Sequence, residues 1–172
     1  TSNADGARSV PFSLQVIEKE VSQLAAIFGV PEQGQKLNKA LAERIAHAQQ
    51  AAHRQRPLKV VFWFSSSRLN GDPWVAGNYG APGWISKTLG LTNIIASKDE
   101  WPAVTWESIA RAQPDIIVIA VKPWRVEEII DQIKGILDYD KQIIVSVAAG
   151  ITFDLLNTYL TKNTGFDDCL TT

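Results

Sequence analysis

An unbroken run of six apolar residues, Ile116 to Val121, constrains the fold of this chain more than any other stretch. The run is too short to span a membrane and too continuous for a strand with one face in solvent. It therefore predicts a strand that is buried on both faces of a parallel sheet. Asp115 precedes the run and Lys122-Pro123 follows it. A proline at that point ends the ladder of main-chain hydrogen bonds, so the strand is expected to stop there.

Strands and helices alternate along the rest of the chain. Further strands are expected at 58–64, 91–96 and 142–148, and helices at 14–28, 32–54, 81–89, 106–112, 124–137 and 153–160. The alternation predicts an α/β fold, a three-layer, mainly parallel, Rossmann-like sheet with helices on both faces. A long linking helix, 32–54, precedes it and spans roughly 33 Å at about 1.5 Å per residue. We predict a helical segment over residues 1–57 and an α/β lobe over 58–172.

Composition excludes several classes of function. The 17 basic and 18 acidic residues nearly balance, so nucleic acid is not an expected partner. No apolar run approaches the length of a membrane span and no signal peptide appears near the start, so membrane insertion is not expected either. Cys169 has no second cysteine to pair with. His47 and His53 are six residues apart, so they do not share a helix face as metal ligands three or four residues apart would. No metal site and no catalytic triad are expected.

Candidate ligand-binding residues follow the first buried strand. The polar loop from Ser65 to Pro73 leaves its carboxyl end, where open α/β sheets place their ligands, and it carries Arg68. The loop lacks the spacing of a phosphate-binding loop. Trp74 and Tyr79 come next, among glycines and amides, a composition that suits stacking on a flat organic ligand. Packing of these aromatic residues at a hinge is the alternative.

Several motifs between about residues 10 and 120 carry a family resemblance. They are the helix 37–54, Gly71-Asp72-Pro73-Trp74, the run 80–85 with 89–93, and the run from Glu100 to Glu107 followed by 112–118. This segment resembles the helical-backbone class of ABC-transporter substrate-binding proteins, which handle siderophores, haem and cobalamin. The resemblance implies a periplasmic or cell-envelope, non-catalytic binding lobe without a cofactor, for an organic metal-chelate, haem-like or corrin-like ligand. An ABC-transporter permease would be its protein partner.

The same resemblance assigns roles to two residues. Trp101 would face the ligand cleft, and Glu107 would be a surface carboxylate that docks on arginines of the permease. The alternative is a structural tryptophan wedged against Pro102 and an ordinary glutamate in the first turn of a helix. In this family the ligand is held between two lobes, and the other lobe precedes the segment. The resemblance therefore implies that half of the ligand-binding surface would come from residues before Thr1.

A second resemblance begins near residues 119–121. The turn Val121-Lys122-Pro123 and the run from 141 to 152, with Ala148-Ala149-Gly150, are similar to the second half of the dinucleotide-binding domain of pyrroline-carboxylate reductase. In that family both turns border the nicotinamide of NADP, which implies cofactor-binding roles for these six residues. The Gly-x-Gly-x-x-Gly turn that receives the pyrophosphate is absent from the sequence. The alternatives to a binding lobe are therefore an NADP-dependent oxidoreductase fragment and a folded chimera without activity.

Overall fold

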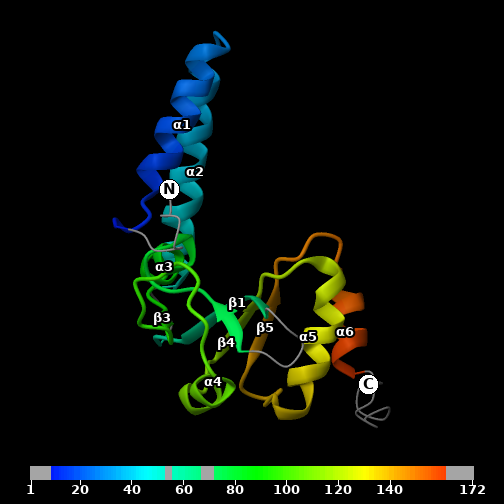
Figure 1. The fold of residues 1–172 in the computed structure, drawn as a ribbon. Coiled ribbons are helices and arrows are strands. Elements are labelled where there is room, and N and C mark those ends of the chain that lie inside the picture. The colour runs from blue at the N-terminus through cyan, green and yellow to red at the C-terminus, as the bar shows by residue number, and fades with distance from the viewer. Residues whose placement is uncertain (1–8, 53–55, 67–71, 162–172) are drawn as a thin grey trace. The chain divides into compact units, whose positions relative to one another are not determined.

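The computed structural model describes residues 9–52, 56–66 and 72–161, which form helices and the strands of one sheet (Figure 1). The helices are α1 (Leu14–Ile27), α2 (Pro31–Ala52), α3 (Ala81–Thr88), α4 (Trp106–Ala112), α5 (Val126–Ile133) and α6 (Phe153–Thr161). The strands are β1 (Lys59–Ser66), β2 (Pro73–Val75), β3 (Thr92–Asn93), β4 (Ile116–Ile119) and β5 (Ile143–Ser146). Two short 3-10 turns are η1 (Pro123–Arg125) and η2 (Lys134–Ile136).

The chain divides into two compact units. The first unit is Thr1–Lys59 with Ala76–Pro102, and the second unit is Val60–Val75 with Ala103–Thr172. The predicted division into a helical segment over 1–57 and a lobe over 58–172 stays a prediction.

The sheet has the strand order β2-β1-β4-β5, with β3 paired to β1. Strands β1, β4 and β5 run parallel, and their register aligns Val60 with Ile116 and Ile116 with Ile143. Only β2, among these four strands, is antiparallel to its neighbour. The mainly parallel α/β fold is therefore confirmed, with the predicted apolar run as an interior strand.

Several predicted elements are shorter than expected. The strand expected at 91–96 is reduced to β3, because the side chain of Asn93 donates to Ala76 O (2.9 Å) and accepts from the Ile95 amide (3.2 Å). These bonds turn the backbone away from a ladder. The helix expected at 124–137 divides into η1, α5 and η2, and η2 contains Gly135, a poor helix former. Strand β2 was not expected.

The core of the second unit lies between the sheet and α5. Val126, Ile129, Ile130 and Ile133 of α5 are all buried, and their spacing of three and four places them on one face of the helix. Ile119 of β4 is fully buried, at 0% exposure. At the last strand of the sheet the burial is different. Ile143, Val145 and Val147, which alternate along β5 and its extension and so share a face, are all exposed.

Helices α1 and α2 form an antiparallel hairpin in the first unit (Figure 1). Gly29 ends α1 with a φ of +70°, a conformation that glycine adopts without strain. Gly34 is buried against Ala25, and a Cβ at Gly34 would collide with the Ala25 side chain. Asn38 of α2 donates to Glu18 O of α1 (3.0 Å). Close packing of the two backbones therefore depends on glycine at position 34.

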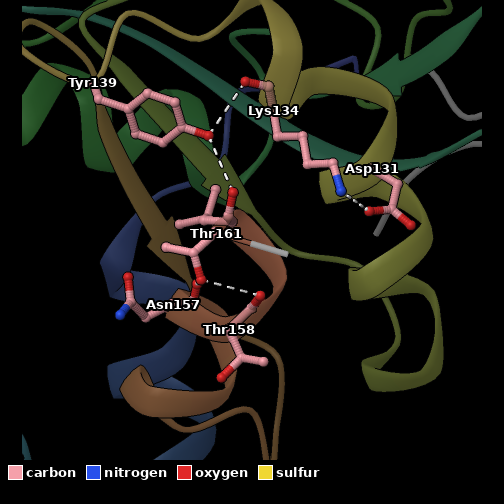
Figure 2. Close-up of polar contacts among 7 residues, drawn as sticks. Asp131, Lys134, Tyr139, Asn157, Thr158 and Thr161 are labelled. Carbon is pink, nitrogen blue, oxygen red and sulfur yellow. Dashed lines mark hydrogen bonds and ion pairs between the residues drawn. The ribbon is translucent and has the colours of Figure 1, made fainter. Parts of the chain in front are cut away.

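Tyr139 connects the end of α6 to the turn η2 in the second unit (Figure 2). Its hydroxyl lies 3.2 Å from Lys134 O and 3.5 Å from Leu160 O, so its one proton is shared between the two carbonyls. Lys134 Nζ in turn pairs with Asp131 Oδ1 of α5 at 2.6 Å. Partial burial raises the pKa of the Tyr139 phenol above its ordinary value, which keeps the hydroxyl protonated as a donor.

Ile119→Asp should destabilise the second unit by several kcal/mol, because the carboxylate would be buried in the sheet without a partner. Ile143→Asp is the matched control on the neighbouring strand, where the side chain is 53% exposed. Urea denaturation of the two variants should give a much lower midpoint for Ile119→Asp alone. Equal midpoints would contradict the interior position of β4.

Tyr139→Phe should lower the free energy of unfolding by about 0.5 kcal/mol at neutral pH, the low end for one hydrogen bond at an exposed site. Because the folded-state pKa is raised above 10.0, this contribution is fully present below pH 10.0 and is lost as the pH rises through the folded-state pKa. Urea titrations of both proteins at pH 8 and again above pH 10 measure the difference. A difference that does not shrink with rising pH would refute a role for the phenol proton.

Candidate functional site

The expected ligand-binding residues fall in both compact units. Arg68 lies outside the described residues. Trp74 belongs to the second unit, and Tyr79 and Trp101 belong to the first.

Trp74 is the middle residue of β2, between the buried residues Pro73 and Val75. Alternation along a strand turns its side chain to the opposite face, where it is exposed. The backbone of Trp74 also bridges to Ala103, and the Val104 amide donates to Pro73 O (3.1 Å). Strand β2 therefore fixes both Trp74 and the segment that leads into α4.

Glu107 lies in the first turn of α4, as the sequence predicts. Thr105 caps the helix, with its hydroxyl oxygen accepting from the Ser108 amide (3.3 Å), and the Ser108 hydroxyl donates back to Thr105 O (2.7 Å). The Glu107 side chain is exposed, and the helix macrodipole favours a carboxylate at this position. The cap thus presents a negative charge to solvent on a defined helix end.

Tyr79 and Trp101 lie on two segments of the first unit that are hydrogen-bonded to each other. The Gly77 amide donates to Glu100 O (3.3 Å), and the Asn78 amide donates to Ser97 O (2.8 Å). A Cβ at Gly77 would collide with the carbonyl of Asp99, so glycine is required for this approach. The pairing fixes Tyr79 on one segment and Trp101 on the other.

The surroundings of Tyr79 combine an aromatic ring with a cation. Its carbonyl accepts from the Phe12 amide (2.8 Å), and Lys98 Nζ lies 5.9 Å from the ring centroid. Phe12 also packs edge-on against Trp84 of α3, with ring centroids 6.0 Å apart. Trp101 is 38% exposed. A stacking surface for a planar molecule is the chemistry that this arrangement supports.

The six residues of the alternative cofactor site lie at the carboxyl edge of the sheet. Val121-Lys122-Pro123 follows β4 and Ala148-Ala149-Gly150 follows β5, and the register Ile119 to Ser146 places the two strand ends side by side. Val121 is buried, whereas Lys122, Ala149 and Gly150 are exposed. Lys122 Nζ lies 5.2 Å from the ring of Trp124, an exposed residue for which the sequence predicts only a helical position. Trp124 directly follows Pro123 at the end of a strand, and this position in the sequence could have indicated that its side chain is exposed.

Over residues 9–52, 56–66 and 72–161, no group of three or more His, Cys, Asp and Glu side chains could hold a metal ion. His47 is exposed on α2, and His53 and Cys169 lie outside the described residues. Within the same ranges, every helix is too short or too polar to cross a membrane.

Comparisons with known proteins identify the family. The periplasmic binding protein family matches residues 3–136 of the chain. A search of curated proteins gave no match.

Solved structures show the same fold. An ABC transporter substrate-binding protein from Listeria monocytogenes EGD-e is 21% identical, with a TM-score of 0.63 over 88% of this chain and 66% of its own. The periplasmic heme-binding protein RhuT from Roseiflexus sp. RS-1 is 21% identical, with a TM-score of 0.61 over 84% of this chain and 59% of its own. IsdE of S. aureus, solved with heme, is 21% identical, with a TM-score of 0.59 over 78% of this chain and 56% of its own.

The chain thus spans between 56% and 66% of the length of these three proteins. The family match covers most of the sequence, whereas identities this low show the fold alone. The chain belongs to the periplasmic binding protein family, whose members bind solutes and are not enzymes.

Proposed function

We propose that the chain is a solute-binding lobe of an ABC-type uptake system for an iron-chelate, haem-like or cobalamin-like ligand. The observation that carries the proposal is the family match over residues 3–136. Two of the similar structures are described as a heme-binding protein and as a complex with heme, which supports a planar, metal-containing ligand. Such a lobe works in the periplasm or cell envelope, where it passes its ligand to a permease.

The aromatic residues support a flat ligand. Trp74 and Trp101 expose part of their rings, and Lys98 places a positive charge close to the ring of Tyr79. Exposed tryptophan rings suit stacking on a macrocycle, and a nearby ammonium suits carboxylates at its edge. We propose Trp74, Tyr79 and Trp101, together with Arg68, as ligand-binding residues.

Glu107 is the proposed contact with the permease. It is exposed, and it lies in the first turn of a capped helix. A carboxylate held in this way can form bidentate hydrogen bonds with an arginine of a partner.

The reductase interpretation has one observation in its favour, the adjacency of the two turns at the carboxyl edge of the sheet, where dinucleotides bind in open α/β folds. The family match includes the first of these turns and ends before the second. Both the NADP-binding role of these six residues and the origin of the chain as a chimera stay predictions.

Trp101→Ala should weaken ligand binding by roughly 1–3 kcal/mol, because the substitution removes a partly exposed aromatic surface on which a flat ligand can stack. Wild type and variant are titrated with haemin and with cyanocobalamin, and binding is followed by absorbance. Trp101→Phe is the matched control and should retain part of the affinity. If Trp101→Ala unfolds the lobe, or leaves the affinity for the bound probe unchanged, Trp101 is a structural residue.

Glu107→Gln should reduce ligand-dependent stimulation of the permease ATPase in proteoliposomes while ligand affinity stays at the wild-type value. The reason is that the variant removes only the charge offered to a partner arginine. Glu43→Gln on α2 is the control, since Glu43 is also an exposed helical glutamate. Equal ATPase stimulation by wild type and Glu107→Gln would remove Glu107 from the docking surface.

A further inference from the structure

The second unit contains a cavity of about 390 Å³ that none of the proposed ligand-binding or docking residues lines. It lies over one face of the sheet, between α4 and the end of α5. Val61, Trp63 and Ile117 form its floor, and Trp106 and Ile109 form the wall from α4. Ile133, Ile136 and Leu137 form the opposite wall.

The cavity exists because the elements around it are short. Helix α4 has seven residues and none of them is buried, although Trp106 and Ile109 are apolar. On the other side α5 gives way to η2, and Ile136 is 72% exposed. Apolar side chains on both walls therefore border open space instead of packing against each other.

Several polar residues at the cavity satisfy one another, whereas the buried indole N–H of Trp63 has no hydrogen-bond partner among the residues that the structure describes. Gln142 donates to Pro114 O (2.9 Å) and accepts from the Asp138 amide (3.0 Å). Lys141 Nζ lies 2.6 Å from Asp138 Oδ2. This hydrogen bond lowers the pKa of Asp138 and raises the pKa of Lys141, so both groups are charged at neutral pH. Asp115 also lines the cavity, which therefore carries two acidic groups and one basic group.

The position of the polar residues separates this cavity from the carboxyl edge of the sheet. Asp115 directly precedes β4, and Gln142 directly precedes β5. Both residues thus lie at the amino ends of parallel strands, whereas α/β sheets bind their usual ligands at the carboxyl ends.

We propose that this cavity is a second binding site, for a small, neutral, apolar molecule. Its volume is within the range of small-molecule sites, roughly 300–1,000 Å³. Water inside it meets mainly apolar walls and gains few hydrogen bonds, so an apolar molecule displaces it favourably. The excess of acidic groups at the cavity disfavours anions. The site goes beyond the proposed solute-binding function and does not depend on it.

The test uses the full 172-residue chain and the neutral fluorophore N-phenyl-1-naphthylamine. Tryptophan excitation should give saturable energy transfer to the probe with a stoichiometry of one, because Trp63 and Trp106 line the cavity. Ala110→Trp fills the cavity from an exposed position on α4 and should weaken binding at least about tenfold. Arg111→Trp adds the same ring at the next residue, which does not line the cavity, and should leave the affinity within about twofold.

Ile136→Ser is the second variant, since it removes an exposed wall residue at little cost in stability and should weaken binding several-fold even if Ala110→Trp fails to fold. The anionic analogue 8-anilinonaphthalene-1-sulfonate should bind more weakly than the neutral probe. No saturable binding, or binding that both α4 variants weaken equally, would overturn the proposal. Tighter binding of the sulfonate than of the neutral probe would overturn the assigned ligand class.

Discussion

Parallel pairing on both sides of β4 is the constraint on which the second unit depends. A strand with both faces buried must satisfy every main-chain donor and acceptor within the sheet. β4 does so by pairing with β1 and β5, and the pairing continues past its end, where the Ala120 amide donates to Trp63 O and the Val147 amide donates to Ile119 O. The turns that follow β4 and β5 are thereby held at one edge, and the polar residues that precede them are held at the other. The alternative cofactor residues lie at the first edge, and Asp115 and Gln142 of the cavity lie at the second.

The interior strand could be predicted from sequence because burial on both faces leaves a local mark, a run without polar interruption. β2 leaves no such mark. Its three residues include a proline, and the pairing of Trp63 with Val75 that holds it joins residues distant in the chain. The strand predicted at 91–96 was too long for the opposite reason. The apolar pattern indicated main-chain pairing there, whereas the side chain of Asn93 forms hydrogen bonds with the backbone of Ala76 and Ile95. Non-local pairing and local side-chain competition both escape a periodicity argument.

The candidate site was predictable to a similar degree. The cap at Thr105 follows from residue type and position, and it places Glu107 as expected. The glycines near the aromatic residues were interpreted as part of a ligand-binding composition, whereas Gly77 and Gly83 serve close approaches to the Asp99 and Asn78 carbonyls. The cavity beside α4 could not be predicted, because it results from the lengths of two helices relative to the width of the sheet beneath them.

The exposed apolar face of β5 has a consequence for how the chain behaves in concentrated solution. β5 is the last strand in the order of the sheet that residues 9–52, 56–66 and 72–161 form, so it is an edge strand of that sheet. An edge strand with exposed isoleucine and valine side chains can form main-chain hydrogen bonds and apolar contacts with another extended segment. Charge is the usual deterrent at such an edge, and here Asp140 and Lys141 carry it at the amino end of the strand only. Salt screens those charges and leaves the apolar face of β5 unchanged, so the apolar face is the part of this edge whose tendency to associate does not rest on charge.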